Sequence, residues 1–209
     1  GLTSAPLLHS ITQDEEPPAL ELLAPGAGAL LRGTIAAEAR ATDLNGIADV
    51  QFRLDEVTVG LDAAPPFRVS VDTAVVPDGL RVVSALARDR AGNLRSAGVP
   101  VTVDNTRPEV RIVAPAPGAV VVGPIEVLVE AADATSGVAQ VELAVNGTSR
   151  SVAETPPYRF MMDSKELRPG TNVLVARAID RAGNGAESVP VSIVPSGMTV
   201  EISEPRDGA

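Results

Sequence analysis

The chain of 209 residues contains no cysteine and no tryptophan, and it has a single histidine. Without cysteine it forms no disulfide and offers no thiolate as a nucleophile or metal ligand. The histidine, His9, lies in the N-terminal stretch, so a Ser-His-Asp triad and a histidine-built zinc site have no candidate further along the chain. The acidic residues fall in short turns, which disfavours two carboxyl groups facing each other across a glycosidase cleft. We therefore expect that the chain is not an enzyme.

Aromatic residues are equally scarce, at 2% of the chain. Surfaces that bind sugars usually stack sugar rings on aromatic side chains, so this composition disfavours a carbohydrate-binding surface. The formal net charge of −10 disfavours a nucleic-acid partner, which would call for a basic face. The chain also has no run of 18 or more apolar residues, and we therefore expect no direct membrane span.

What the sequence does contain is a repeat. The segment Asp-Arg-Ala-Gly-Asn at residues 89–93 occurs again, letter for letter, at residues 180–184, which is 91 residues later. The pair Pro65-Pro66 recurs as Pro156-Pro157 with the same offset. One architectural unit of about 90 residues is therefore used twice.

Alternating apolar and polar residues predict short β-strands in each unit. Val50, Phe52 and Leu54 alternate with polar residues, which is the period of a half-buried strand. Asn146-Gly147 is a strong signal for a two-residue hairpin turn. No segment has sustained helical periodicity, and about seven strands per unit with regular turn signals are typical of a β-sandwich. We expect one aromatic ring in each core, at Phe67 or Tyr158.

The repeat also predicts the domain boundaries. We expect one domain over residues 18–106 and a second over residues 107–196. Residues 1–17 are either an N-terminal tail or the end of a preceding repeat, because residues 10–18 resemble residues 100–108. Residues 197–209 are expected to start a third repeat, because residues 200–209 resemble residues 110–119. This pattern predicts that the chain comes from a longer array.

These motifs together resemble a known family. In the first unit they are Asp43 with Gly46-Ile47, Pro66-Phe67, Asp72-Thr73, Asp78-Gly79 and residues 89–93, and the second unit matches them at residues 133–138, 157–158, 163–164, 169–170 and 180–184. This order of motifs resembles the bacterial Ig-like domains that occur in tandem on secreted and cell-surface proteins. The resemblance implies an all-β chain of two tandem Ig-like β-sandwich domains with about seven strands each. It implies neighbouring Ig-like repeats as partners and an extracellular or cell-surface location.

The resemblance also implies that certain acidic residues lie close together. In an Ig-like sandwich, the loop after the second strand and the last hairpin loop lie at the N-terminal end of the domain. Two groups of three would then meet at such ends, namely Asp14, Asp43 and Asp89, and Asp104, Asp133 and Asp180. Clustered carboxylates suit Ca²⁺, which takes about 6–8 oxygen ligands. The alternative is that these residues cap turns by binding their own backbone, with no ion. At the next junction, residues 194–198 have no acid in the position of Asp104.

The sequence leaves more than one function open. The first is a non-catalytic spacer or adhesion module of an extracellular or cell-surface bacterial protein, with calcium as its one candidate cofactor. The second is an accessory module of a secreted enzyme that binds a surface protein or a glycan. The third is a subunit of a surface filament or motility complex that assembles through edge strands.

Overall fold

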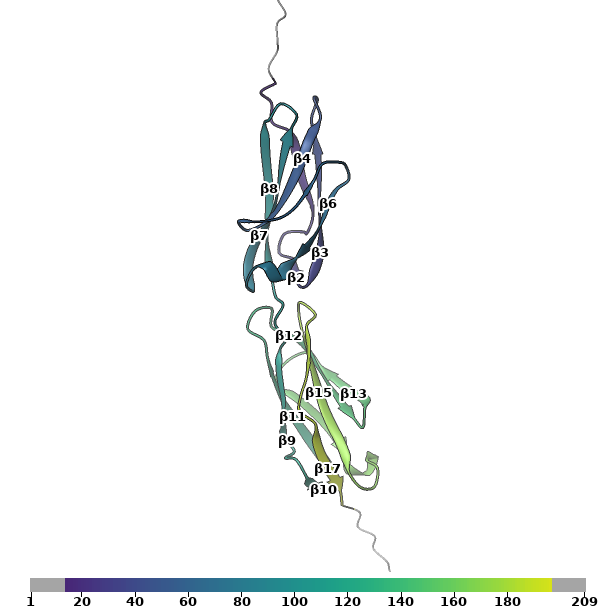
Figure 1. Cartoon of the computed structure of the whole chain (residues 1–209). Coiled ribbons are helices and arrows are strands. Elements are labelled where there is room, and N and C mark those ends of the chain that lie inside the picture. The colour runs from purple at the N-terminus through teal and green to yellow at the C-terminus, as the bar shows by residue number, and fades with distance from the viewer. Residues whose placement is uncertain (1–13, 197–209) are drawn as a thin grey trace, which may run out of the picture. The chain divides into compact units, whose positions relative to one another are not determined.

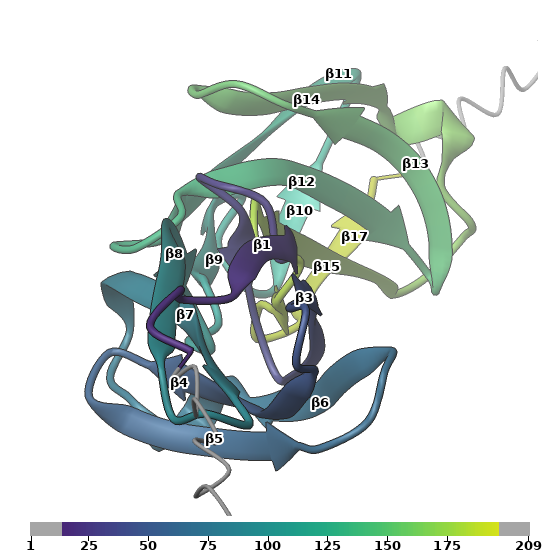
Figure 2. The same ribbon diagram turned by 90° about the horizontal axis from the view of Figure 1, so that it is seen from above.

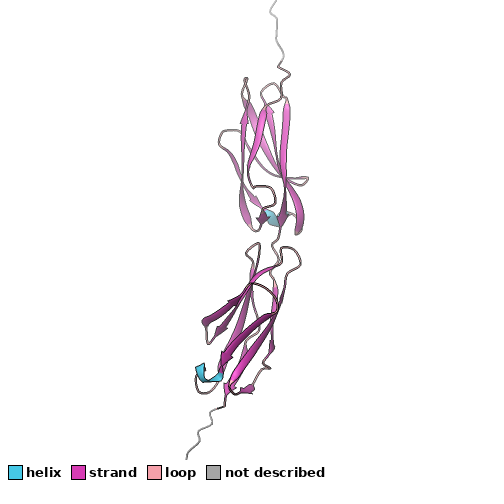
Figure 3. Cartoon of the chain, turned by 180° about the vertical axis from the view of Figure 1, so that it is seen from behind, coloured by secondary structure: helices cyan, strands magenta, loops and turns pink. Residues whose placement is uncertain are grey.

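The computed structural model describes residues 14–196, which belong to two compact units, Gly1–Asn105 (unit 1) and Thr106–Ala209 (unit 2). Each unit is built almost wholly from strands, with one short 3-10 helix (Figures 1 and 3). No helix of the described part is long and apolar enough to cross a membrane. The predicted end of a preceding repeat and the predicted start of a third repeat fall mainly outside the described residues.

Unit 1 is a sandwich of two sheets. One sheet has the strand order β1-β3-β6, and the other has the order β2-β8-β7-β4-β5. All neighbours pair antiparallel except β2, which pairs parallel with β8. The elements are β1 (Ala19–Ala24), β2 (Leu30–Leu31), β3 (Thr34–Thr42), β4 (Ile47–Leu54), β5 (Val57–Asp62), β6 (Phe67–Asp72), η1 (Thr73–Val75), β7 (Gly79–Asp89) and β8 (Leu94–Val103).

Unit 2 repeats this topology. Its sheets have the orders β9-β11-β14 and β10-β17-β15-β12-β13, and a short extra strand, β16, pairs with β15. The parallel pair of β10 with β17 corresponds to that of β2 with β8. The elements are β9 (Glu109–Ala114), β10 (Ala119–Val121), β11 (Pro124–Ala132), β12 (Val138–Val145), β13 (Thr148–Ala153), β14 (Tyr158–Asp163), η2 (Ser164–Glu166), β15 (Asn172–Asp180), β16 (Gly185–Glu187) and β17 (Val191–Pro195).

The predicted fold class, two tandem Ig-like β-sandwich domains, is confirmed. Alternation places one side of each strand in the core, as at Val50, Phe52 and Leu54, which are all fully buried. The hairpin predicted at Asn146-Gly147 joins β12 to β13, and both residues have positive φ angles of 53° and 77°. Within residues 14–196, unit 1 has eight strands and unit 2 has nine, because short strands such as β2 add to the expected seven.

The prediction of one ring per core was wrong. Each core contains two aromatic side chains, Phe52 with Phe67 in unit 1 and Tyr158 with Phe160 in unit 2. In unit 2 the two rings are two residues apart on β14 and therefore point to the same face. In unit 1 they come from opposite sheets, on β4 and β6. All four aromatic side chains of the protein are thus buried.

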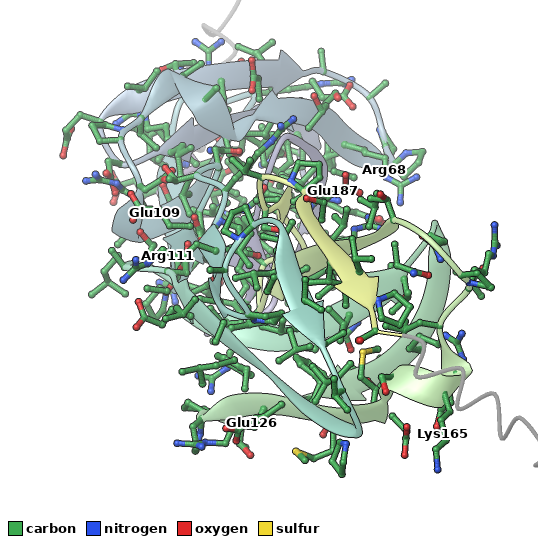
Figure 4. All side chains as sticks on the ribbon, turned by 90° about the horizontal axis from the view of Figure 1, so that it is seen from below. Arg68, Glu109, Arg111, Glu126, Lys165 and Glu187 are labelled. Atoms are coloured by element: carbon green, nitrogen blue, oxygen red, sulfur yellow. The ribbon has the colours of Figure 1, made fainter. Side chains whose placement is uncertain are left out.

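The outer face of each three-stranded sheet has cross-strand ion pairs. Glu21 on β1 lies opposite Arg40 on β3, and in unit 2 the same two positions are occupied by Arg111 and Glu130, with the charges exchanged. Arg111 is exposed and projects from its strand, as Figure 4 shows. A cross-strand ion pair requires opposite charges, but either strand can carry the acidic residue. Because both members of each pair are exposed, each pair contributes little stability.

Strand β5 differs from its counterpart β13 in how it meets the opposite sheet. Figure 2 shows β5 running beside β6, and a Cβ atom added at Gly60 on β5 would lie 2.7 Å from Cγ1 of Val69 on β6. Glycine at position 60 therefore allows the two sheets to approach at this edge. In unit 2, five of the six residues of β13 are exposed, so β13 is not packed against the opposite sheet as β5 is.

We expect Gly60→Ala to destabilise unit 1 by about 1–3 kcal/mol, because the new methyl group overlaps Val69. Chemical denaturation followed by circular dichroism measures this change. The matched control is Gly26→Ala, since a Cβ atom there would meet nothing within 4 Å. Equal stability of the two variants would contradict the close approach of β5 and β6.

Candidate cation site in unit 1 and its counterpart in unit 2

Three acidic residues meet at one end of unit 1, as the sequence predicted. Asp14 precedes β1, Asp43 follows β3, and Asp89 is the last residue of β7. Each offers a carboxylate oxygen, and these oxygens lie within 4.8 Å of one another. The sandwich topology explains this grouping, because it brings the start of β1 and the ends of β3 and β7 to the same end of the unit.

Asp89 organises the loop that follows it. Its Oδ1 accepts hydrogen bonds from the backbone N–H groups of Gly92 (2.6 Å) and Asn93 (2.8 Å), and its Oδ2 accepts one from Asn93 Nδ2 (2.8 Å). Asp89 is only 1% exposed. Burial alone would raise the pKa of this carboxyl, but the hydrogen bonds from Asn93 and Gly92 outweigh it and hold the pKa below its usual value. Asp89 is therefore a carboxylate at neutral pH.

The same loop is attached to the chain that enters β1. Asn93 Nδ2 donates to the carbonyl oxygen of Asp14 at 3.1 Å and to that of Glu16 at 3.3 Å. Asp89 therefore positions Asn93, and Asn93 in turn holds the segment that contains Asp14. The exact repetition of residues 89–93 indicated that the loop matters, but only the structure identifies this second contact.

Asp14 and Asp43 also cap turns. Asp43 Oδ1 accepts the backbone N–H of Asn45 at 2.7 Å, and Asp14 Oδ1 accepts that of Glu16 at 3.1 Å. Asp14 Oδ2 accepts Asn45 Nδ2 at 2.7 Å. The structure therefore contains the turn-capping bonds that were one of the two alternatives. Capping does not exhaust the acceptor capacity of these carboxylates, because each carboxylate has about four lone-pair sites.

The donor set suits a hard cation. Among residues 14–196, none of the three carboxylates forms an ion pair with an arginine or lysine, so their mutual repulsion is not neutralised by a basic side chain. All the ligand atoms are oxygens, which Ca²⁺ and Mg²⁺ prefer and zinc sites seldom use alone. Calcium–oxygen bonds are about 2.3–2.6 Å long, so oxygens on one ion lie at most about 5 Å apart. The separation within 4.8 Å fits that limit.

Unit 2 contains the counterpart of two of these three residues. Asp133 Oδ1 accepts the backbone N–H groups of Thr135, Ser136 and Gly137 at 2.8–3.1 Å. Asp180 is 1% exposed and binds Asn184 through the same two contacts that Asp89 makes with Asn93. Carboxylate oxygens of Asp133 and Asp180 lie within 4.8 Å of each other. The remaining predicted residue, Asp104, belongs to unit 1, where its backbone N–H donates to the carbonyl of Leu31 (2.9 Å).

The arginine of the repeated loop has a packing role that sequence reasoning missed. The backbone N–H of Arg90 donates to the carbonyl of Gly46 at 3.1 Å, and its guanidinium lies over that glycine, 3.5 Å from where a Cβ atom would be. Arg181 repeats both features at Gly137. The pairing of a positive-φ glycine after the second strand with an arginine in the last hairpin loop was the signal that could have revealed this contact.

We expect Asp89→Asn to lower the unfolding midpoint of unit 1 by several degrees. The NH2 group that replaces one carboxylate oxygen would point at an N–H donor of Asn93 or Gly92, and that hydrogen bond would be lost. Differential scanning calorimetry measures the effect. The matched variant Asp180→Asn should shift only the transition of unit 2. A midpoint unchanged by both substitutions would mean that these carboxylates do not hold the loops.

The lowered pKa of Asp89 also predicts a pH dependence. A folded-state pKa below the unfolded value of about 3.9 contributes stability that is present above that value and is lost as the pH falls through the folded pKa. The pKa of Asp62 is lowered as well, because its carboxylate accepts backbone hydrogen bonds from Arg68 and Ala64. Melting curves between pH 5 and pH 2 should therefore show a falling midpoint for unit 1, with a shallower fall in Asp89→Asn. Parallel curves for the two proteins would contradict this assignment.

Comparison with known proteins agrees with this architecture. No curated protein matches the chain in sequence. Among solved structures, the fibronectin(III)-like modules of Clostridium thermocellum CbhA match with a TM-score of 0.53 and 18% identity, covering 91% of this chain and 100% of theirs. A 1.5-MDa bacterial ice-binding adhesin matches with a TM-score of 0.47 and 16% identity, covering 87% of this chain and 66% of that one. At 18% identity, the likeness to the CbhA modules shows the fold alone.

The sequence match to a family is more specific. The family described as bacterial Ig domain matches residues 18–85 and again residues 108–176, which together are more than half of the chain. Each matched segment begins just before the first strand of a unit and ends within its long strand β7 or β15. The two copies are therefore the same structural unit, and the chain belongs to the bacterial Ig domain family.

Proposed function

We propose that this chain is a non-catalytic spacer or adhesion module of an extracellular or cell-surface bacterial protein. The observation that carries the proposal is the direct succession of two complete bacterial Ig sandwiches of the same topology. Strand β8 ends at Val103 and β9 begins at Glu109, so only residues 104–108 connect them. A connection this short, with a proline at position 108, limits how far one unit can turn against the next.

We further propose that calcium binds the carboxylate clusters. In unit 1 the proposed ligands are Asp14, Asp43 and Asp89, and the support for them is that their carboxylate oxygens lie within 4.8 Å of one another. In the second copy Asp133 and Asp180 take the places of Asp43 and Asp89. The repeat places Asp104 90 residues after Asp14, so Asp104 is the proposed third ligand. Because Asp14 and Asp104 precede the first strand of their repeats, an ion at either position would fasten the entering chain to its sandwich.

The alternative of an accessory glycan-binding module has less support. A sugar platform needs exposed rings, and Phe52, Phe67, Tyr158 and Phe160 are all buried in the cores. The chain has no other aromatic residue. Our proposed partners are therefore neighbouring Ig-like repeats and a surface protein, without nucleic acid or a direct membrane span. The net charge of −10 favours cations over anionic polymers.

A filament subunit is the other alternative, and the exposed edge strand β13 is the observation in its favour. An edge with free backbone groups can pair with another chain. The edge residues Arg150 and Ser151 are exposed, and Arg150 lies 4.0 Å from the carboxylate of Glu166 on η2. A charge at the edge disfavours strand pairing, so we expect the chain to remain monomeric. Sedimentation velocity at increasing concentration measures this directly, and concentration-dependent assembly would favour the filament.

The proposed ion is tested by thermal melts in calcium, in magnesium and in chelator. Calcium at 100 times its dissociation constant should stabilise a unit by about 2.7 kcal/mol and raise its midpoint by several degrees. Asp43→Asn should abolish the shift of unit 1, because the new amide keeps an oxygen for the N–H of Asn45 but loses the charge. The matched variants Asp133→Asn and Asp104→Asn should act on unit 2 instead. Superimposable curves with and without calcium would overturn the ion site and leave turn capping as the sole role of these residues.

A further inference from the structure

The chain contains three Asn-Gly pairs, at residues 45–46, 146–147 and 184–185. Asparagine followed by glycine is prone to deamidation, because a glycine without Cβ leaves its backbone nitrogen free to approach the side-chain carbon Cγ of the asparagine. The reaction requires the side-chain amide to rotate toward that nitrogen. The hydrogen bonds around each amide therefore decide which of the three pairs reacts in the folded protein.

The amide of Asn146 is held at both ends. Its Oδ1 accepts the backbone N–H of Val173 at 3.0 Å, and its Nδ2 donates to Oδ1 of Asn172 at 2.7 Å. Asn146 also occupies the first position of the tight turn between β12 and β13, with a φ angle of 53°. Reaction here would require both side-chain bonds to break and the hairpin to open.

Asn184 is protected by burial and by Asp180. It is 7% exposed, its Nδ2 donates to Asp180 Oδ2 at 2.8 Å, and its backbone N–H donates to Asp180 Oδ1 at 2.8 Å. Reaction would remove the contact that holds the loop of residues 180–184. A group in this position reacts only through local unfolding, which is rare in a packed sandwich.

Asn45 is neither buried nor held by hydrogen bonds at both ends of its side-chain amide. It is exposed in the loop between β3 and β4, next to Leu44, whose side chain is fully exposed. Within the described residues its side chain makes one hydrogen bond, from Nδ2 to Oδ2 of Asp14 at 2.7 Å, and its Oδ1 accepts none. The nitrogen of Gly46 donates to the carbonyl of Asp43 at 3.2 Å, which is at the long end of the hydrogen-bond range.

We propose that Asn45 is the site of spontaneous deamidation in this protein. The backbone nitrogen of Gly46 loses its proton and attacks Cγ of Asn45, so that a nitrogen–carbon bond forms and the side-chain nitrogen leaves as ammonia. Water then opens the resulting succinimide ring at one of its two carbonyls, which leaves either aspartate or isoaspartate at position 45. The only co-reactant is water, and no electron transfer occurs.

The product changes the carboxylate cluster directly. The Asn45 amide, whose Nδ2 donates to Asp14 at 2.7 Å, is replaced by a carboxylate, which adds a fourth negative charge beside Asp14, Asp43 and Asp89. Without a cation the new charge repels Asp14 and loosens the loop from the chain entering β1. If the proposed calcium site is correct, the new aspartate adds an oxygen ligand, and this consequence alone rests on the proposed function. In unit 2 the glycine that corresponds to Gly46 is Gly137, and Ser136 precedes it, so this loop has no Asn-Gly pair.

The site is tested by incubating the full chain at mildly alkaline pH in chelator and mapping its peptides by mass spectrometry. The folded protein should gain the mass of amide-to-acid conversion at residue 45 at least several-fold faster than at residues 146 and 184. The same protein in urea is the control, since the three pairs should react at similar rates once unfolded. Asn45→Gln should remove the fast conversion and leave the other two unchanged. Conversion at residue 146 or 184 as fast as at residue 45 in the folded protein would overturn the proposal.

The consequence is tested separately with Asn45→Asp. In chelator this variant should have a lower midpoint for unit 1 than the unchanged chain, because two carboxylates then face each other. In calcium the difference should shrink or reverse if an ion is bound. A deficit that calcium does not relieve would count against the ion while leaving the deamidation result intact. An equal midpoint in chelator would show that the new charge does not act on Asp14.

Discussion

A buried carboxylate at the end of a central strand organises the N-terminal end of each unit. Asp89 and Asp180 each hold the loop that follows them through an asparagine four residues later, and the asparagine of unit 1 continues the network to the chain that enters β1. A buried charge is costly unless hydrogen bonds satisfy it. The bonds from Asn93 and Gly92 do so for Asp89, and those from Asn184 do so for Asp180. Removal of one partner would affect the loop, the entering strand and the carboxylate cluster together.

Several other positions differ between the two copies while they meet the same physical requirement. The cross-strand pair of Glu21 and Arg40 is reversed in unit 2, as Arg111 and Glu130. The turn residue Asp55 is replaced by Asn146, and both use Oδ1 to accept a backbone N–H from the neighbouring strand. In each case the physical requirement is opposite charge or an acceptor oxygen, and more than one residue type meets it. The loops with the buried carboxylate have a narrower requirement and remain identical.

The sequence predicted the fold because its signals are local and repeated. Alternation at residues 50–54 identifies a buried face, and the repeat shows which turns correspond. The meeting of Asp14, Asp43 and Asp89 followed from topology once the family was recognised. The two rings in each core were missed, although Tyr158 and Phe160 are two residues apart and so share a face. The stacking of Arg90 over Gly46 and the bonds from Asn93 to residues 14 and 16 depend on side-chain directions across distant segments, which no local pattern specifies.

We propose that the clustered carboxylates act as calcium ligands as well as turn caps. Isothermal titration calorimetry of the full chain with calcium tests it most directly. We expect heat of binding at two sites, reduced to one in Asp43→Asn and absent in the double variant Asp43→Asn with Asp133→Asn. A titration of the unchanged chain that is indistinguishable from that of the double variant would contradict the claim, and the acids would then serve the fold alone.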